Sequence, residues 1–265
     1  VREQEGGMNQ LVEQATLAEG TGLTWYEVAM AKLDAQIVTE TTELNNPQQI
    51  TDTSFSITPY VVAVQTRVTD RTAARISANA YAKIGSLAQN AIQRKKDLDG
   101  ITMLDGFGNG QPNSGSSTLT SGHVAAGMAF ITGNATEPGK APFRCVLHPY
   151  QLRDIEDELA VTGTYPVMEG LTARVFKEGY RGMIAGAQLY SNGNISISGN
   201  EAKGGLFAQD TLVLVQGRAP RAVPVRQEHI GGGATDIFVY DEYAYGERLD
   251  SWGWEIYSDA TQPTS

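Results

Sequence analysis

Residues 77–104 constrain the fold most, because they predict a single long amphipathic helix. Ser77 is of a type that caps helix N-termini, and Gly85 and Gly100 are the weak points, the second expected to end or bend the helix. Apolar residues recur at helical spacing at Ala80, Ile84, Leu87, Ala91, Leu98 and Ile101, with Lys83, Gln89, Gln93, Arg94 and Lys96 between them. Unbroken, this helix would be about 40 Å long. We expect it to act as a spine against which sheets pack.

Composition favours a soluble fold of one or two domains. The chain has 265 residues, 41% of them hydrophobic, and 30 acidic against 20 basic residues give a formal charge of −10. This balance argues against broad binding to nucleic acid or to anionic membranes. No apolar run approaches the roughly 20 residues of a membrane span, and the first residues lack a signal-peptide pattern. We therefore expect a soluble protein with no membrane partner, not secreted by that route.

Catalytic and metal-binding patterns are missing from the sequence. A single cysteine, Cys145, excludes an intrachain disulfide, and it lies in an apolar segment where thiols are normally inert. The three histidines, His123, His148 and His229, are too scattered for a typical metal site. The acidic residues at 154–158 have the spacing of a solvated helix face. The sequence therefore predicts no catalytic residue, no cofactor and no metal.

His148 is the position that keeps an enzymatic alternative open. It lies where a predicted strand meets a predicted helix, a place that active sites use. No nucleophile motif accompanies it, so the favoured interpretation is a residue that starts the helix before Pro149. A small α/β enzyme built around His148 is the alternative from another functional class.

The residues before the spine helix predict an arm and an extended β excursion. Residues 1–22 are polar and hold at most one short helix, whereas 24–38 fit a helix and a strand equally well, so that choice stays open. Alternating patterns at 54–58 and 60–69 predict strands. We interpret 23–66 as a two-stranded excursion, which is marginal alone and therefore needs a partner surface.

The residues after the spine helix predict a mixed α/β body. The glycines at 106, 108 and 110 superficially resemble a nucleotide-binding loop, but they follow a helix, so a plain helix stop is expected. Helices are predicted at 121–132 and 148–160, and a buried strand at 143–147. From 165 onward the chain is mostly strands, among them 173–176. Within this part, residues 205–215 suggest a helical turn followed by a strand. Residues 236–257 suggest a C-terminal aromatic hairpin that packs on the apolar stripe of the spine helix. Asp97 and Asp99 are interpreted as surface or capping charges.

A group of charges suggests contact between copies of the chain. Arg67, Asp70, Arg71 and Arg75 gather where the excursion joins the spine, and Glu40 and Glu43 lie within the excursion. Arginine and carboxylate form directional, bidentate pairs, which suit a contact with one register. We hypothesise that Glu40 or Glu43 of one copy meets Arg67 or Arg71 of another. The alternative is unrelated surface charge, worth about 0–1 kcal/mol per pair.

The order of these segments resembles the major capsid proteins of tailed bacteriophages, whose Hong Kong 97-like fold also occurs in encapsulins. The segments that carry the resemblance are GTGLTWYEV (20–28), TETTEL (39–44), ITPYVVAVQTRVTDRTAARIS (57–77), LDGFGNGQPNSG (104–115), RCVLHPYQLRDIEDEL (144–159) and YAYGERLDSWGWEIYSDA (243–260). The resemblance covers nearly the whole chain from about residue 20 and rests on the order of the segments.

This resemblance implies an α+β fold divided as in that family. Residues 1–22 would be the N-terminal arm and 23–66 an extended loop reaching over a neighbouring subunit. Residues 67–119 and 221–265 would form the peripheral domain with the spine helix, and 120–220 the axial domain. Some members crosslink through a lysine in the extended loop, but this chain has none between Leu33 and Ala82. We therefore predict no isopeptide from that loop.

The same resemblance implies a structural shell protein and not an enzyme. It would assemble with itself into hexamers and pentamers, forming an icosahedral head around double-stranded DNA that it touches only by weak, non-specific contacts. Scaffolding, portal and decoration proteins would be its partners. It would assemble in the host cytoplasm and remain in the virion. The closest alternative is an encapsulin-like compartment around a protein cargo.

Overall fold

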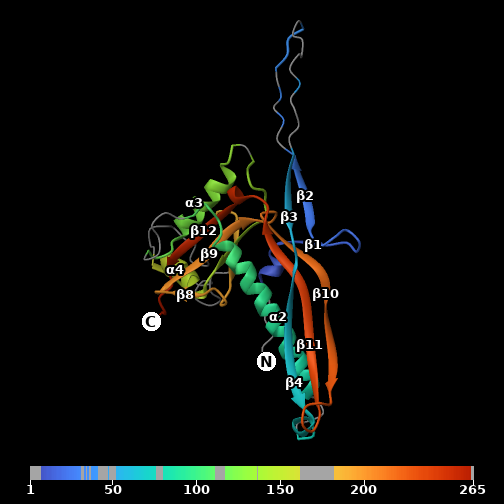
Figure 1. The fold of residues 1–265 in the computed structure, drawn as a ribbon. Helices are drawn as coiled ribbons and strands as arrows, with labels where there is room; N and C mark the ends of the chain where they lie inside the picture. The colour runs from blue at the N-terminus through green and yellow to red at the C-terminus, as the bar shows by residue number, and fades with distance from the viewer. Residues whose placement is uncertain are drawn as a thin grey trace.

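The computed structural model describes residues 7–30, 52–75, 80–110, 117–135, 137–161 and 182–263, with positions 33, 35, 37–40 and 47 between the first two ranges. Glu43 and the strand predicted at 173–176 lie outside the described residues. Figure 1 shows an elongated molecule: an α/β body to one side, a long helix and sheet running down from it, and a thin ribbon rising above.

A four-stranded sheet and the spine helix form the long part of the molecule. Its strands are β1 (Glu13–Thr16), β10 (Leu212–Gln227), β11 (Ala234–Glu247) and β4 (Tyr60–Thr69), in that spatial order. β1 is parallel to β10 and the other pairs are antiparallel. Helix α2 (Ala80–Leu104) lies along one face, where Ala88 and Ile92 pack against Val239. At the lower end β4 leads into the short helix α1 (Asp70–Ala73).

A six-stranded sheet with two helices forms the body. Its strand order is β12 (Gly253–Asp259), β9 (Glu201–Ala208), β5 (Phe143–Leu147), β7 (Ala187–Ser191) and β6 (Met183–Ile184), with β8 (Ile197–Ser198) beside β9. The helices are α3 (Ser121–Thr132) and α4 (Pro149–Val161), as predicted. Val124, Met128 and Ile131 of α3 and Ile155 of α4 bury their side chains against this sheet.

Twice the chain passes directly from a strand of one sheet to a strand of the other, from β9 to β10 and from β11 to β12, and this makes two sequence predictions wrong. Residues 205–215 contain no helical turn, because β9 runs through a tight turn directly into β10. β11 and β12 do not form a hairpin, because β11 pairs with β10 and β4 whereas β12 pairs with β9. The two crossings lie together, since the Arg248 amide donates to the Thr211 carbonyl at 2.8 Å. Alternation shows which residues share a strand face, but it does not select the partner strand.

The predicted excursion is only partly correct. β2 (Trp25–Met30) and β3 (Asp52–Ile57) form a two-stranded antiparallel ribbon, so the open choice at 24–38 is a strand over 25–30. The strand at 60–69 is not part of this ribbon; as β4 it pairs with β11 along its whole length. Its alternating pattern was read correctly, but its partner lies 169 residues away, as the pair Arg67 and Asp236 shows.

The spine helix is confirmed over 80–104, but its predicted stripe is wrong in places. Leu87 is 49% exposed and Ala91 is exposed, whereas Lys96 and Asp97 are only 4% and 2% exposed. The buried face changes along the helix because its first half packs on the four-stranded sheet and its second half passes beside β9, β12 and the N-terminal segment. The helix continues through both Gly85 and Gly100.

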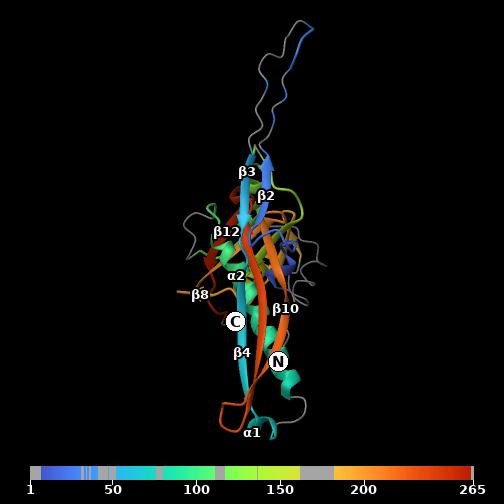
Figure 2. The same cartoon turned by 45° about the vertical axis from the view of Figure 1, so that its right-hand side comes forward.

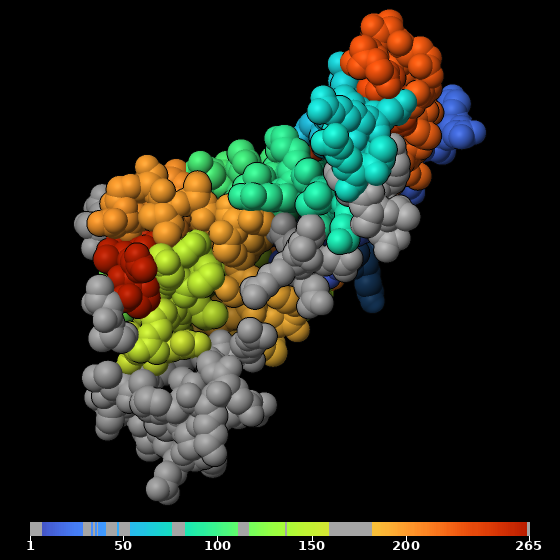
Figure 3. All heavy atoms as spheres, turned by 90° about the horizontal axis from the view of Figure 1, so that it is seen from below, coloured from blue at the N-terminus to red at the C-terminus, as the bar shows by residue number. Residues whose placement is uncertain are grey.

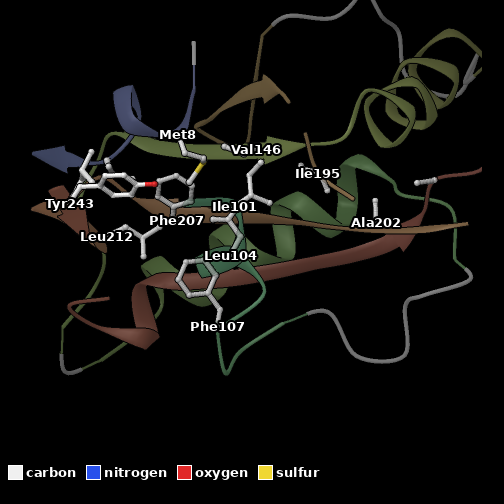
Figure 4. Packing of buried hydrophobic residues seen from close by; sticks show 13 residues of the cluster. Met8, Ile101, Leu104, Phe107, Val146, Ile195, Ala202, Phe207, Leu212 and Tyr243 are labelled. Carbon is white, nitrogen blue, oxygen red and sulfur yellow. The ribbon is translucent and has the colours of Figure 1, made fainter. Parts of the chain in front are cut away.

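The N-terminal segment is more than a polar arm. The short 3₁₀ helix η1 (Met8–Gln10) places Met8, which is fully buried, in the central core. Figure 4 shows Met8, Ile101 and Leu104 around Phe207. Gly100 makes this approach possible, because a Cβ there would lie 2.7 Å from the Met8 Cβ.

Among the helices of the described ranges, none has both the length and the apolarity to cross a membrane.

Candidate intersubunit interface

The ribbon presents one face to the four-stranded sheet, and its other face carries exposed apolar side chains. Side chains of a strand alternate, so Trp25 faces the four-stranded sheet and Glu27 faces Arg248, whereas Tyr26 and Val28 are 67% and 54% exposed. Farther along, Leu33, Ile37 and Val38 are exposed as well. Beside Tyr26 and Val28, the outward face carries the exposed Ser56 and Ser54 of β3. Exposed apolar side chains that gather on one face mark surfaces that another molecule covers.

The root of the ribbon is packed firmly on the four-stranded sheet. Ile57, Trp25 and Phe55 contact a patch of that sheet formed by Val213, Val215 and Ala244. The Trp25 and Phe55 rings meet edge to face at 6.3 Å. Gly246 leaves room for this contact, since a Cβ there would lie 2.4 Å from the Ile57 Cδ1. The ribbon therefore leaves the four-stranded sheet in a defined direction.

Arg248 ties the root to two other elements. Its Nε and Nη2 donate to Glu27 Oε2 at 3.0 and 2.9 Å, and its Nη1 donates to Glu13 Oε2 at 2.8 Å. The Asp210 carbonyl accepts a further bond from Nη1 at 2.7 Å. Burial lowers the pKa of Arg248, but the two carboxylates outweigh burial and raise it above its ordinary value. One guanidinium thus joins β1, β2 and both sheet crossings.

Two of the predicted interface residues are engaged within the chain, at the opposite end of the long sheet. Arg67 donates from Nε and Nη2 to the buried Asp236 at 2.6 and 2.8 Å, which lowers the pKa of that carboxyl. Asp70 accepts from Arg226 at 2.6 and 2.5 Å, and this pairing lowers the pKa of Asp70. Sequence analysis missed Asp236 and Arg226, because no local pattern marks pairs across strands so far apart in the chain.

Comparison with known proteins gives matches at the level of structure only. No protein-family model matches the sequence, and no curated protein matches it. Solved structures do match: the capsid of cyanophage P-SCSP1u aligns with a TM-score of 0.74 and 11% identity, over 98% of this chain and 90% of the other. The capsid of Ralstonia phage GP4 aligns with a TM-score of 0.74 and 11% identity, over 96% and 88%. An encapsulin complex from Synechococcus elongatus PCC 7942 aligns with a TM-score of 0.67 and 12% identity, over 97% and 89%.

The chain has the Hong Kong 97-like fold. This confirms the α+β class and the fold that the order of segments predicted. The domain boundaries expected from the resemblance stay predictions.

The remaining predicted interface residues lie at opposite ends of this Hong Kong 97-like molecule. The segment 37–40 lies above β2 and β3, whereas α1 lies at the lower end of the four-stranded sheet (Figures 1 and 2). Glu40, Arg71 and Arg75 are exposed, and none of the three has an ion-pair partner among the described residues. A contact between Glu40 and either arginine therefore requires two copies of the chain.

Two buried polar networks hold the Hong Kong 97-like spine in place, and sequence analysis missed both. The Lys96 Nζ lies 2.8 Å from Asp241 Oδ2 and donates to Gln216 Oε1 at 3.0 Å. Asp97, predicted at the surface, accepts the Met8 amide at 2.7 Å and the side-chain amides of Asn192 and Asn194 at 2.9 and 2.7 Å. Buried charges need such partners. In the sequence, Lys96 and Asp97 are marked only as charged residues that interrupt the apolar face of a helix.

His148 and Cys145, the residues considered for catalysis, have the surroundings of residues with a structural role. The His148 Nδ1 accepts the Tyr150 amide at 3.1 Å at the start of α4, and burial lowers the pKa of its ring. Cys145 is fully buried, and burial raises the pKa of its thiol. Within the described residues, no three side chains of His, Cys, Asp or Glu gather as a metal site would require.

Proposed function

We propose that this protein is a major capsid protein, which assembles with itself into the hexamers and pentamers of an icosahedral head around double-stranded DNA. The observation that carries the proposal is the likeness to phage capsid structures over nearly the whole chain. Its place would be the virion, after assembly in the host cytoplasm. Scaffolding, portal and decoration proteins would be its partners, and its role would be structural, with no reaction catalysed.

The ribbon and spine would serve this assembly as an overlap between neighbours. The extended loop of one subunit lies on the next one, which covers its exposed apolar face. Because Glu40 and the two arginines of α1 and its end are at opposite ends of the molecule, their contact is head to tail, the arrangement that closes rings of identical subunits. In this proposal Glu40 and Glu43 meet Arg71 and Arg75. Arg67 is the weaker candidate, because Asp236 already binds its guanidinium.

A compartment that stores a protein is the second candidate, supported by the match to the encapsulin complex. Both candidates predict closed shells, so the contents distinguish them. Particles from the natural source should contain genomic DNA if the capsid proposal is right. Particles filled with one protein and free of DNA would favour the compartment.

Assembly itself is tested by negative-stain electron microscopy and light scattering of Val28→Asp. The change adds a charge to an exposed position of the ribbon, so the subunit should fold normally, with an unchanged circular dichroism spectrum. If the ribbon is covered by a neighbour, that charge would be buried and shells should fail to form. The control is Leu87→Asp, a similarly exposed aliphatic position on α2, which should assemble. Wild-type protein that stays a 28.5 kDa monomer under all conditions, with or without co-expressed scaffold, would contradict the proposal.

A further inference from the structure

The outward face of α2 carries unpaired positive charge in an otherwise acidic protein. Between Asp70 and Asp97 the sequence has no acidic residue, although the whole chain has a formal charge of −10. Lys83 and Arg94 are exposed on α2, and neither has an ion-pair partner among the described residues. Eleven residues are three helical turns, so the two cations lie on the same helix face, about 16 Å apart.

The neighbouring side chains of this face are uncharged. Ser86, Leu87 and Asn90 lie on the same side of the helix, opposite the buried Ala88 and Ile92. In Figure 3 the surface of α2 (green) is open on the face seen from below, next to α1 (cyan). We call Lys83, Ser86, Leu87, Asn90 and Arg94 the basic stripe.

The face of the four-stranded sheet that points away from α2 differs in charge from the basic stripe. There Arg67 is paired with Asp236, and Arg218 lies 3.9 Å from Glu242. Arg67 and Arg218 are thus accompanied by carboxylates and Arg221 lies over the Tyr240 ring, whereas Lys83 and Arg94 of the basic stripe have no ion-pair partner among the described residues. Helix α2 and the four-stranded sheet form two layers. A shell built from this part of the molecule turns one of the two layers inward.

We infer that the basic stripe faces the interior of the shell and contacts the phosphates of the packaged duplex. This inference rests on the proposed function, and it adds which side of the subunit meets the DNA and through which residues. Two free cations per subunit give weak, salt-sensitive and sequence-independent contacts, repeated in every copy. Such contacts order the outermost duplex along the wall, while the acidic remainder of the surface avoids tight binding.

The first test measures binding of the purified, unassembled full chain to a long duplex at 50–200 mM salt. Lys83→Gln with Arg94→Gln should weaken binding at least tenfold and reduce the slope of log affinity against log salt by about 1.8, since each phosphate contact contributes about 0.9. Arg218→Gln with Arg221→Gln removes two cations from the other face and should leave both values unchanged. Equal losses in the two double variants, or no loss in the first, would overturn the inference.

The second test locates the stripe in the assembled shell by Leu87→Cys. The native Cys145 is fully buried, so the new thiol is the reactive one. A small maleimide should label it in intact shells, whereas a 5-kDa polyethylene glycol maleimide, too large to enter, should label only free subunits. Labelling of intact shells by the large reagent would place the stripe outside. Protection from both reagents would place it between subunits, and either result contradicts the inference.

Failure of the inference is distinguishable from failure of the proposed function. Electron microscopy of the Lys83→Gln, Arg94→Gln variant should show normal shells. A folded variant that cannot assemble while the wild type does would show that the stripe is a subunit contact, which overturns the inference alone. If the wild type forms no shells, the proposed function fails, and the binding measurement still reports whether the stripe holds DNA.

Discussion

At the scale of single residues, the carboxylate of Glu247 has a pKa raised far above the ordinary value of a glutamate. It lies at the end of β11, where the chain leaves one sheet for the other. Burial raises the pKa of Glu247 to about 7. The hydrogen bond to Asp250 and the negative charge of Asp250 contribute in the same direction. Asp250 in turn accepts the Gly108 amide at 2.7 Å and the Asn109 side chain at 3.0 Å.

Stability should therefore fall as pH rises between about 4.5 and 7, because in this window the folded state holds a proton on Glu247 that the unfolded state has released. Glu247→Gln removes that titration. Relative to the wild type, the variant should gain about 1 kcal/mol of unfolding free energy between pH 5 and pH 8, after allowing for solvent screening of a partly buried group. Urea unfolding at both pH values measures this difference. Glu19→Gln, at an exposed position, should show no such gain.

At the scale of elements, α2 contains two glycines whose surroundings are opposite. Nothing lies within 4 Å of a Cβ at Gly85, whereas one at Gly100 would meet the Met8 Cβ at 2.7 Å and the Tyr245 ring at 3.1 Å. Sequence analysis treated both as weak points of the helix. Only one of them serves a close contact.

The same substitution at these two glycines should change stability in opposite directions. Gly85→Ala should stabilise the protein by about 1 kcal/mol through helix propensity. Gly100→Ala should destabilise it by about 1–3 kcal/mol, because η1 or Tyr245 must move. Urea unfolding of the two variants provides the comparison. Stabilisation by both would mean that η1 is not seated on α2 as described.

Arg248 controls how firmly the ribbon is held. Arg248→Ala removes charge-assisted bonds worth about 1.5–3 kcal/mol each, so amides of β2 should exchange hydrogen at least tenfold faster. Amides of α2 should be unaffected. Arg153→Ala is the matched control, since the Arg153 side chain is 46% exposed and its ion pair with Asp157 lies within α4 in the body. Equal exchange in wild type and Arg248→Ala would show that apolar packing alone holds the root.

At the scale of the whole molecule, the proposed assembly joins its two ends, which a charge reversal can test. Arg71→Glu should reduce shell yield several-fold by placing like charges together. Combining it with Glu40→Arg should restore the yield, because the attractive pair is rebuilt with reversed signs. Particle yield by sedimentation and electron microscopy gives the result. If the double variant assembles no better than Arg71→Glu alone, Glu40 and Arg71 are not partners.

The shell should be held together without covalent crosslinks from the extended loop. No lysine lies between Leu33 and Ala82, so Lys32 carries the only lysine amine of that loop, and we expect it to form no isopeptide bond. Intact particles on a denaturing gel should give one band at 28.5 kDa. A ladder of higher masses would show crosslinks, and mass spectrometry would locate them.

The sequence by itself determined the local features: the spine helix, the alternating strands, the turn after the helix and the charged group at 67–75. Periodicity and side-chain chemistry act over a few residues, so they can be read from neighbours in the chain. The order of these segments also determined the fold, which the structural matches confirm.

Only the tertiary structure decided which strands pair and which side chains pack together. It paired β4 with β11 and separated β11 from β12, and it turned Lys96 and Asp97 inward while leaving Leu87 exposed. The candidate interface changed likewise, since Arg67 and Asp70 found partners within the chain while Arg71 and Glu40 were left at opposite ends. These outcomes depend on packing between segments remote in sequence. An amphipathic pattern specifies that a face is buried, but not which element buries it.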